Sequence, residues 1–393
     1  MTDVSPQSAA RVAPPARPGT VRVPFLDLHA THASLKRAIL ADVADLIDSS
    51  AFSNGPAVGE FESAFAGYCG SACAVGVGSG LDALRLALLA GGLEPGAEVV
   101  VPAGTFVATV EAVTQAGGVP VLVDVGEDDL NLDVQAAESA IGSGTHALLP
   151  VHLYGQMADM AGLGRIAAAR GLMLLEDACQ AHGASRDGIR AGAAGTAAAF
   201  SFYPGKNLGA MGDAGAMTTD DLALAERVRA LREHGQRRKY HHDEPGYTAR
   251  LDTIQALVLL NKLPALDAWN AQRRSVASAY LDALAGVGDL VLPPVPAGSE
   301  PVWHLFVIRT AEPEALAAFL GERGVATGRH YPQPIHMTGA YRHLGHRLGD
   351  FPVAERLARE GLSLPIYPGM SDAQLEAVVA GVRGFFAAGG ARS

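Results

Sequence analysis

Basic charge, cysteine and long apolar runs are all scarce in this 393-residue sequence, and each scarcity excludes a class of protein. Lysine and arginine number 30 against 41 acidic residues, a formal charge of −11, so no nucleic-acid partner is expected, because phosphate backbones bind basic faces. The three cysteines, Cys69, Cys73 and Cys179, favour a reducing, cytoplasmic location and no disulfide framework. Cys69 and Cys73 lack a matching second pair of Cys or His, so no metal site is expected. No apolar run reaches the roughly 18 residues of a membrane-spanning helix, which argues against a membrane partner.

Short apolar runs are what the sequence does contain, and they alternate with helical stretches. The candidate strands are rich in Val, Leu and Ala and show no polar alternation: Ala72–Val77, Glu98–Val101, Val119–Asp124, Ala147–Val151, Leu172–Glu176, Ala197–Phe202 and Ala214–Thr218. Between them lie helix candidates such as Leu81–Leu89, in which Leu81, Leu84 and Leu88 share one face. Strands of this kind are typical of a sheet covered on both faces. The pattern predicts a three-layer α/β/α domain with a mostly parallel sheet.

The second half of the sequence changes character. An exposed polar loop is predicted at His234–His242, then a long helix at about 252–280, a strand at Trp303–Ile308, a helix at Pro313–Arg323 and a mostly helical stretch from Asp350. We therefore predict a flexible N-terminal tail over residues 1–20, a large domain over 21–255 and a smaller α+β C-terminal domain over 256–393.

Lys206 is the most informative residue. It follows an apolar strand in a loop shaped by Pro204 and Gly205, and it comes 29 residues after Asp177, at the end of another apolar strand. Ligands of open α/β sheets bind at the carboxyl ends of strands. A lysine and an acid placed there suit pyridoxal 5'-phosphate (PLP): the amine forms a Schiff base with the aldehyde, and the acid pairs with the pyridinium nitrogen. A lysine taken at random would be a solvated surface residue, and the alternative role for Asp177 is to cap the next helix.

Other residues fit the same cofactor. The segment Gly76–Asp82 joins a strand to a helix, and its small residues let backbone N–H groups face a phosphate. It is not a dinucleotide fingerprint, because Leu81 stands where that motif needs glycine. Ser201 can add a hydroxyl to the phosphate and Gln180 can reach a ring hydroxyl. Phe106 follows a strand and can stack on a pyridine ring, although in isolation a core role would be commoner.

Three motifs, Pro150–Gln156, Glu176–Ala184 and the segment around Lys206, resemble the sugar aminotransferases of the DegT/DnrJ/EryC1/StrS group, which have the fold type I (aspartate aminotransferase-like) architecture. The resemblance extends from Val23 to Met370. It implies that Lys206 is the Schiff-base lysine and proton shuttle, that Asp177 pairs with the pyridinium nitrogen, and that Gln180 contacts the ring hydroxyl. It also assigns phosphate contacts to Gly80, Leu81 and Ser201 and ring stacking to Phe106.

The resemblance further implies a homodimer with shared active sites. In the family, an Asn of a Gly-x-Asn-x-Arg-Leu-Asp segment reaches the phosphate bound by the neighbouring subunit. Here the segment spans Gly246–Asp252, and Thr248 takes the place of that Asn. A Thr hydroxyl can donate one hydrogen bond but is shorter, so this contact is expected to be weakened or shifted.

Because the sequence keeps Lys206 where some relatives on this fold have His, the resemblance favours transamination over dehydration. It implies an amino-acid donor, L-glutamate, and a nucleotide-linked keto-deoxysugar acceptor, with amination at C3 of a dTDP-3-keto-6-deoxyhexose. Segments that meet the nucleotide-sugar in such enzymes resemble 237–240 and 327–332 here. The expected substrate contacts are Tyr203, Lys239, Tyr240, His330 and Tyr331.

Three other functions stay open at this point. A C4 aminotransferase acting on a 4-keto nucleotide sugar would use the same cofactor residues, and so would a cyclitol (keto-inositol) aminotransferase. A non-catalytic regulator that retains the fold is the third, although the intact Lys206 and Asp177 argue against it.

Overall fold

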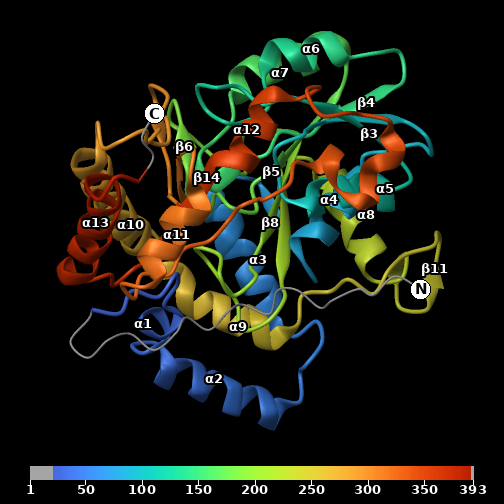
Figure 1. The fold of residues 1–393 in the computed structure, drawn as a ribbon. Coiled ribbons are helices and arrows are strands. Elements are labelled where there is room, and N and C mark those ends of the chain that lie inside the picture. The colour runs from blue at the N-terminus through green and yellow to red at the C-terminus, as the bar shows by residue number, and fades with distance from the viewer. Residues whose placement is uncertain (1–20, 391–393) are drawn as a thin grey trace, which may run out of the picture.

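The computed structural model describes residues 21–390, so the tail predicted over residues 1–20 lies outside the described residues. A seven-stranded sheet stands at the centre, in the order β1-β9-β8-β5-β4-β2-β3 (Figure 1). Its strands are β1 (Cys73–Val77), β2 (Glu98–Pro102), β3 (Val119–Val123), β4 (Thr145–Leu148), β5 (Met173–Asp177), β8 (Ala197–Ser201) and β9 (Gly215–Thr219). Neighbouring strands run parallel except where β9 pairs antiparallel with β1 and β8. The mostly parallel sheet and the predicted strands are confirmed, although β4 covers Thr145–Leu148 where Ala147–Val151 was predicted.

Both faces of the sheet are buried, because alternate residues of each strand join different apolar cores. Val99 and Val101 of β2 belong to a core shared with α4 (Gly80–Ala90), α5 (Val107–Gln115) and α8 (Leu222–Arg232). Val100, between them, belongs to a core shared with α3 (Pro56–Cys69), α6 (Val134–Ala140), α7 (Met160–Arg170) and α9 (Thr253–Lys262). Strands covered on both sides can be apolar throughout, which explains the missing polar alternation. The predicted three-layer α/β/α architecture is confirmed.

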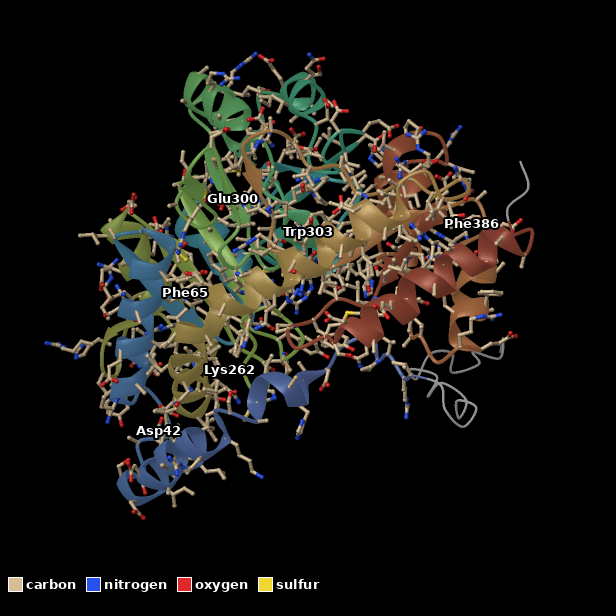
Figure 2. The ribbon with its side chains drawn as sticks, turned by 90° about the vertical axis from the view of Figure 1, so that its left-hand side faces the viewer. Asp42, Phe65, Lys262, Glu300, Trp303 and Phe386 are labelled. Atoms are coloured by element: carbon tan, nitrogen blue, oxygen red, sulfur yellow. The ribbon has the colours of Figure 1, made fainter. Side chains whose placement is uncertain are left out.

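A smaller core lies around the C-terminal helices. It combines α10 (Leu266–Leu284), α11 (Pro313–Gly321) and α13 (Asp372–Ala387) with the antiparallel pair β13 (Phe306–Arg309) and β14 (Gly361–Leu364). Figure 2 shows the run of α9 and α10 passing from the side of Phe65 and Lys262 to the side of Phe386. The single helix predicted over 252–280 is wrong, because a 3-10 turn at Leu263–Ala265 separates α9 from α10. Pro264 lies in this turn, where it lacks the N–H that a continuous helix requires.

The remaining elements are short or peripheral: α1 (Leu28–His32), α2 (Lys36–Ser49), α12 (Pro352–Glu360), β6 (Ser185–Arg186), β7 (Ile189–Arg190) and β12 (Ser299–Glu300). The polar segment at 234–242 is mostly exposed, as predicted, but it forms a protruding hairpin of β10 (Gln236–Arg238) and β11 (His241–His242) (Figure 1). The strand predicted from Trp303 begins later, at Phe306, because Trp303 has a left-handed φ of 48° that interrupts an extended chain.

Segments from the C-terminal half also complete the apolar core beside the central sheet. Ile335, Tyr341 and Phe351 pack into the apolar core that contains α4 and α5. The Asp124 carboxylate, just after β3, accepts the N–H groups of Val353 and Ala354 at 2.9 Å each and so fixes the start of α12. The division of the chain at residue 255 therefore stays a prediction. Within residues 21–390, the helices are too short or too polar to cross a membrane.

Candidate active site

A cavity of about 520 Å³ opens at the carboxyl ends of the parallel strands. Residues that follow β1, β2, β5 and β8 contribute to its wall, as expected for a ligand site on an open α/β sheet. Most of the predicted site residues line it: Gly80, Leu81, Phe106, Asp177, Gln180, Ser201, Tyr203, Lys206, His330 and Tyr331. The structure thus brings together residues that are up to 251 positions apart, from Gly80 to Tyr331.

Lys206 reaches the cavity from the loop between β8 and β9. Its backbone N–H donates to the carbonyl oxygen of Tyr203 at 2.8 Å, which closes the turn at Pro204 and Gly205. Burial lowers the pKa of the Lys206 ammonium group, while Cys179 and Asp177 oppose this shift. A lowered lysine pKa increases the share of neutral, nucleophilic amine at neutral pH. A buried amine of lowered pKa therefore stands where the Schiff-base lysine is predicted.

The acidic pair at the end of β5 is divided between two environments. Asp177 lines the cavity, where its Oδ2 accepts from the Thr109 hydroxyl at 2.7 Å and its Oδ1 from the Cys179 N–H at 3.2 Å. Glu176 projects to the opposite face, as successive strand residues do. There its Oε2 pairs with His152 Nε2 at 2.9 Å, while His152 Nδ1 accepts a backbone N–H, which leaves the ring proton on Nε2. Asp177 is therefore the acid of the pair that is available to a ligand.

Glu176 should be essential for stability. Besides His152, its carboxylate accepts the backbone N–H groups of Gly192, Ala194 and Gly195 at 2.8–3.0 Å. The change Glu176→Gln turns one acceptor oxygen into an NH₂ that faces buried donors, which should cost about 1–3 kcal/mol. Thermal unfolding followed by circular dichroism would measure the loss, with the exposed Glu60→Gln as the matched control. Equal melting temperatures for the two variants would contradict this account.

Gln180 is held from both ends of its carboxamide. Its Oε1 accepts the N–H of Tyr154 at 2.8 Å, and its Nε2 donates to the hydroxyl of Tyr331 at 3.1 Å. These partners fix the orientation of the amide, because the backbone N–H can only donate. The Tyr154 hydroxyl in turn donates to the carbonyl of His330. Gln180 therefore presents a fixed polar group beside Asp177 in the cavity wall.

The turn from β1 into α4 brings three segments into close contact. Ser79 is the N-cap, and its hydroxyl oxygen accepts the Asp82 N–H at 3.0 Å. A Cβ built on Gly80 would lie 2.6 Å from Cys179 Sγ and 2.7 Å from Ser201 Cβ, so only glycine fits there. Gly80, whose N–H group opens α4, thus lies against Ser201 in the cavity wall. A helix N-terminus with a nearby hydroxyl suits a phosphate group.

Two aromatic pairs border the opening. The Phe106 ring is 46% exposed, and its centroid lies 5.2 Å from that of Tyr331. A half-exposed ring in a cavity wall is available to stack on a planar ligand. The His330 ring stacks on Phe25 at 5.4 Å, and its Nδ1 pairs with the Ser363 hydroxyl at 2.8 Å. The predicted stacking and substrate roles of these residues stay predictions.

Histidines near Lys206 are held neutral. Burial, together with the positive charge of Lys206, lowers the pKa of His182 to about 3 and the pKa of His330 to about 4. The same two causes hold the pKa of His304 well below its ordinary value. Lys206 is the one lysine or arginine among the described residues that line the cavity. Lys206 therefore supplies the positive charge of the cavity wall.

Three predicted site residues lie outside the cavity wall. Thr248 is exposed, and its hydroxyl pairs with His234 Nε2 at 3.1 Å. Lys239 and Tyr240 are exposed in the β10–β11 hairpin, where the Lys239 ammonium lies 5.3 Å from the centroid of the Tyr240 ring. Because the hairpin is exposed, Lys239 and Tyr240 can contact only a ligand or a second chain that binds against it. Their contacts with cofactor and substrate stay predictions.

Several residues that line the cavity or contact its lining were not predicted from the sequence. Thr109 orients Asp177, and Thr105 in turn pairs with Thr109 at 2.9 Å between hydroxyl oxygens. His304 and Phe25 also line the cavity, although they lie far from Lys206 in the sequence. The position of Thr105 beside Phe106, at the end of a predicted strand, was a usable signal. Nothing in the spacing of His304 pointed to the site.

The cavity fits PLP in each part that the cofactor requires. Lys206 supplies an amine of lowered pKa, and the Asp177 carboxylate can pair with a ring nitrogen. The helix N-terminus at Gly80, where no side chain fits, can take the phosphate. Gln180 and Phe106 would hold the ring edge and the ring face.

Comparisons with known proteins agree with this fit. Residues 33–383 match the DegT/DnrJ/EryC1/StrS aminotransferase family. A dTDP-3-amino-3,4,6-trideoxy-alpha-D-glucose transaminase of Streptomyces venezuelae is 47% identical over 368 residues, which cover 94% of this chain and 97% of that protein. The erythromycin biosynthesis sensory transduction protein EryC1 of Saccharopolyspora erythraea is 48% identical over 358 residues, covering 91% and 98%. The crystal structure of S. venezuelae DesV in complex with a ketimine intermediate superposes with a TM-score of 0.91 at 47% identity, covering 93% of this chain and 99% of that one. The chain therefore belongs to the DegT/DnrJ/EryC1/StrS family and is a PLP-dependent sugar aminotransferase.

Proposed function

We propose that this protein transfers an amino group from L-glutamate to C3 of a dTDP-3-keto-6-deoxyhexose, as a step in the biosynthesis of a deoxyaminosugar for an antibiotic. The observation that carries the chemistry is the pair of Lys206 and Asp177 in one cavity, at the ends of β8 and β5. The similarity to a named dTDP-3-aminosugar transaminase over 94% of the chain supports the substrate. The three free cysteines suit a reducing compartment such as the cytoplasm.

Each wall residue has a task in this proposal. When bound, PLP supplies an electron sink and carries the amino group between the two substrates. Lys206 attaches the cofactor and, once released, takes up and returns a proton through Nζ in each half-reaction. Asp177, oriented by Thr109 and the Cys179 N–H, holds a negative charge at the ring nitrogen. The residues around Gly80 bind the phosphate and prevent the cofactor from turning.

The shortage of cations in the cavity supports a dimer with shared sites. Its described wall carries the carboxylates of Glu111, Asp177 and Asp213 but only Lys206 as a cation. A substrate diphosphate therefore needs cations from elsewhere. The exposed β10–β11 hairpin carries Arg237, Arg238 and Lys239 and protrudes from the body (Figure 1). We propose that a second copy of the chain supplies this hairpin, together with Thr248.

An exposed apolar face supports the same assembly. Leu40 and Ile47 of α2 are 58% and 60% exposed, and Phe52, Met211 and Ile254 are also exposed large apolar residues. Figure 2 shows α2, with Asp42, at the edge of the molecule. Apolar faces of this kind in soluble proteins mark association sites. Light scattering coupled to gel filtration should give twice the chain mass of 40.5 kDa, and a monomer at all concentrations would refute the dimer.

The substrate is tested with a panel of keto compounds and L-glutamate, read by mass and NMR. The proposal expects turnover of a dTDP-3-keto-6-deoxyhexose with the new amine at C3. Turnover confined to a 4-keto nucleotide sugar, or to a keto-inositol, would replace this substrate by one of the two alternatives. UDP-linked 3-keto sugars belong in the panel, because they test recognition of the base separately from recognition of the sugar.

A regulator remains the second candidate, because one relative of 48% identity carries the name of a sensory transduction protein. The two functions differ in a half-reaction that needs no sugar. L-glutamate added to the PLP-loaded protein should bleach the visible absorbance and release one equivalent of 2-oxoglutarate. A protein that binds PLP but never converts it with any amino donor would favour the regulator.

Thr248 provides a test of the shared site. The change Thr248→Asn gives a longer side chain with two N–H donors, so cofactor binding should become equal or tighter than in the parent. Titration of the apo-protein with PLP, followed by absorbance, measures the Kd. A clear loss of affinity would show that Thr248 and its partner His234 belong to a rebuilt contact that Asn disrupts.

A further inference from the structure

The residue that follows the reactive lysine is tied to three separate places. Asn207 is 6% exposed, and its Nδ2 donates to Asn270 Oδ1 and to the carbonyl of Val302, both at 2.9 Å. Its Oδ1 pairs with His304 Nδ1 at 3.2 Å. Because a carbonyl oxygen only accepts, the amide orientation is fixed, and His304 must donate from Nδ1. The carboxamide of Asn207 therefore uses both of its hydrogens and its oxygen.

Helix α10 anchors the Asn207 side chain through Asn270. Asn270 is 1% exposed, and its Nδ2 donates to the carbonyl of His182 at 2.8 Å, beyond the end of β5. Arg273, one turn later, is 2% exposed and donates to the carbonyls of Trp303 (3.1 Å) and Ile366 (2.9 Å). One face of α10 thus holds the Lys206 loop, the segment after β5 and the segment around His304.

We propose that Asn207 is a positioning residue for Lys206, and that Asn270 is the anchor through which it acts. The proposal rests on the proposed role of Lys206 as the residue that attaches PLP. Consecutive Cα atoms are only 3.8 Å apart, so fixing Asn207 fixes the start of the lysine side chain. Other hydrogen bonds hold the loop on either side of Asn207. The Lys206 N–H donates to Tyr203, and the Ala210 N–H donates to the Phe202 carbonyl. The Gly209 carbonyl accepts from Lys262 Nζ, and the Met211 N–H donates to Gln255.

The hydrogen bond between Asn207 and His304 also sets the tautomer of the His304 ring. His304 lines the cavity, and its Nδ1–H is committed to Asn207. Burial and the charges of Lys206 and Arg273 lower its pKa, so the ring stays neutral and adds no positive charge beside the lysine. Removal of the Asn207 oxygen frees both the loop and the ring. The expected defect is therefore in the approach of the Lys206 amine to the cofactor aldehyde.

The test measures how fast apo-protein captures PLP, by stopped-flow absorbance, with borohydride trapping and peptide mass spectrometry to locate the bond. Asn207→Ala and Asn270→Ala should slow capture by roughly 10- to 100-fold, the range for a displaced reacting group. Asn131→Ala is the matched control, because Asn131 is also 1% exposed and bonds through both amide atoms, but to Leu153 and Gln156. It should lower the melting temperature similarly and leave the capture rate unchanged.

A conservative variant makes the test independent of folding defects. In Asn270→Asp, burial keeps the introduced carboxyl protonated at low pH, where it can still accept from Asn207 and donate to the His182 carbonyl. Capture should match the parent at pH 6 and slow as pH rises and the carboxyl ionises. Equal capture rates for the parent and Asn207→Ala, or a pH profile of Asn270→Asp parallel to that of the parent, would overturn the positioning role. Trapped cofactor on a residue other than Lys206 in the parent protein would instead overturn the proposed function.

Discussion

Replacing Lys206 with alanine should lower transamination by roughly 10²- to 10⁴-fold, the range for loss of a positioned proton-transfer group, and should also abolish covalent attachment of PLP. Two functions disappear together, because the same Nζ is the nucleophile for the cofactor and the base of each half-reaction. Burial lowers the pKa of this amine, so the parent protein should bind PLP covalently at neutral pH. Steady-state kinetics and borohydride trapping measure the two losses separately.

The small number of lysines makes the borohydride-trapping experiment easy to interpret. It contains four lysines, at positions 36, 206, 239 and 262, so a trapped label is easily assigned to one peptide. Lys36→Ala, on the exposed side of α2, is the matched control and should behave as the parent. Lys206→Arg keeps the charge but offers no nucleophilic amine, so it should fail as Lys206→Ala does. Near-normal activity in either position-206 variant would refute the assignment.

Asp177→Asn should reduce turnover by roughly 10²- to 10³-fold while PLP still attaches to Lys206. Asn has nearly the shape of Asp and can still accept from Thr109, but it carries no charge to hold a proton on the ring nitrogen. The loss should fall on kcat more than on KM, because the charge matters most when electrons move into the ring. Absorbance spectra would show that the cofactor is bound.

Two further variants help to interpret the effect of Asp177→Asn. Asp221→Asn makes the same chemical change at the N-cap of α8, where Asn caps as well as Asp, and should be neutral. Thr109→Ala removes one hydrogen bond to Asp177 and should cause a smaller loss than Asp177→Asn. A fully active Asp177→Asn would place the electron sink elsewhere.

The strands of the sheet could be predicted because burial on both faces leaves a strong local signal: continuous runs of Val, Leu and Ala. The Lys206 loop and the Gly80 turn were also visible, since proline and glycine mark backbone shapes directly. The break at Pro264 carried the same kind of signal, yet the apolar pattern on both sides suggested one helix.

The other site residues could not be predicted, because they are brought together by tertiary contacts that leave no pattern in the sequence. The choice of Asp177 over Glu176 as the acid that faces the ligand came from the family resemblance, because an apolar strand without alternation does not reveal which of two successive residues faces which side of the sheet. Thr109 and His304 reach the site by packing across the fold, from 68 and 98 positions away from Asp177 and Lys206 respectively. Asn207 stood beside the lysine in the sequence, but its three partners lie 63 to 97 positions further along the chain.

The return of Ile335, Tyr341 and Phe351 to the core around α4 and α5 has a consequence for synthesis on the ribosome. Translation releases the chain from its N-terminus, so the central sheet emerges long before these three side chains. Until about residue 354 has left the exit tunnel, part of the apolar core around α4 and α5 stays uncovered and open to misassociation. A nascent chain stopped near residue 260 should therefore bind chaperones that recognise apolar segments, and the full-length chain should release them.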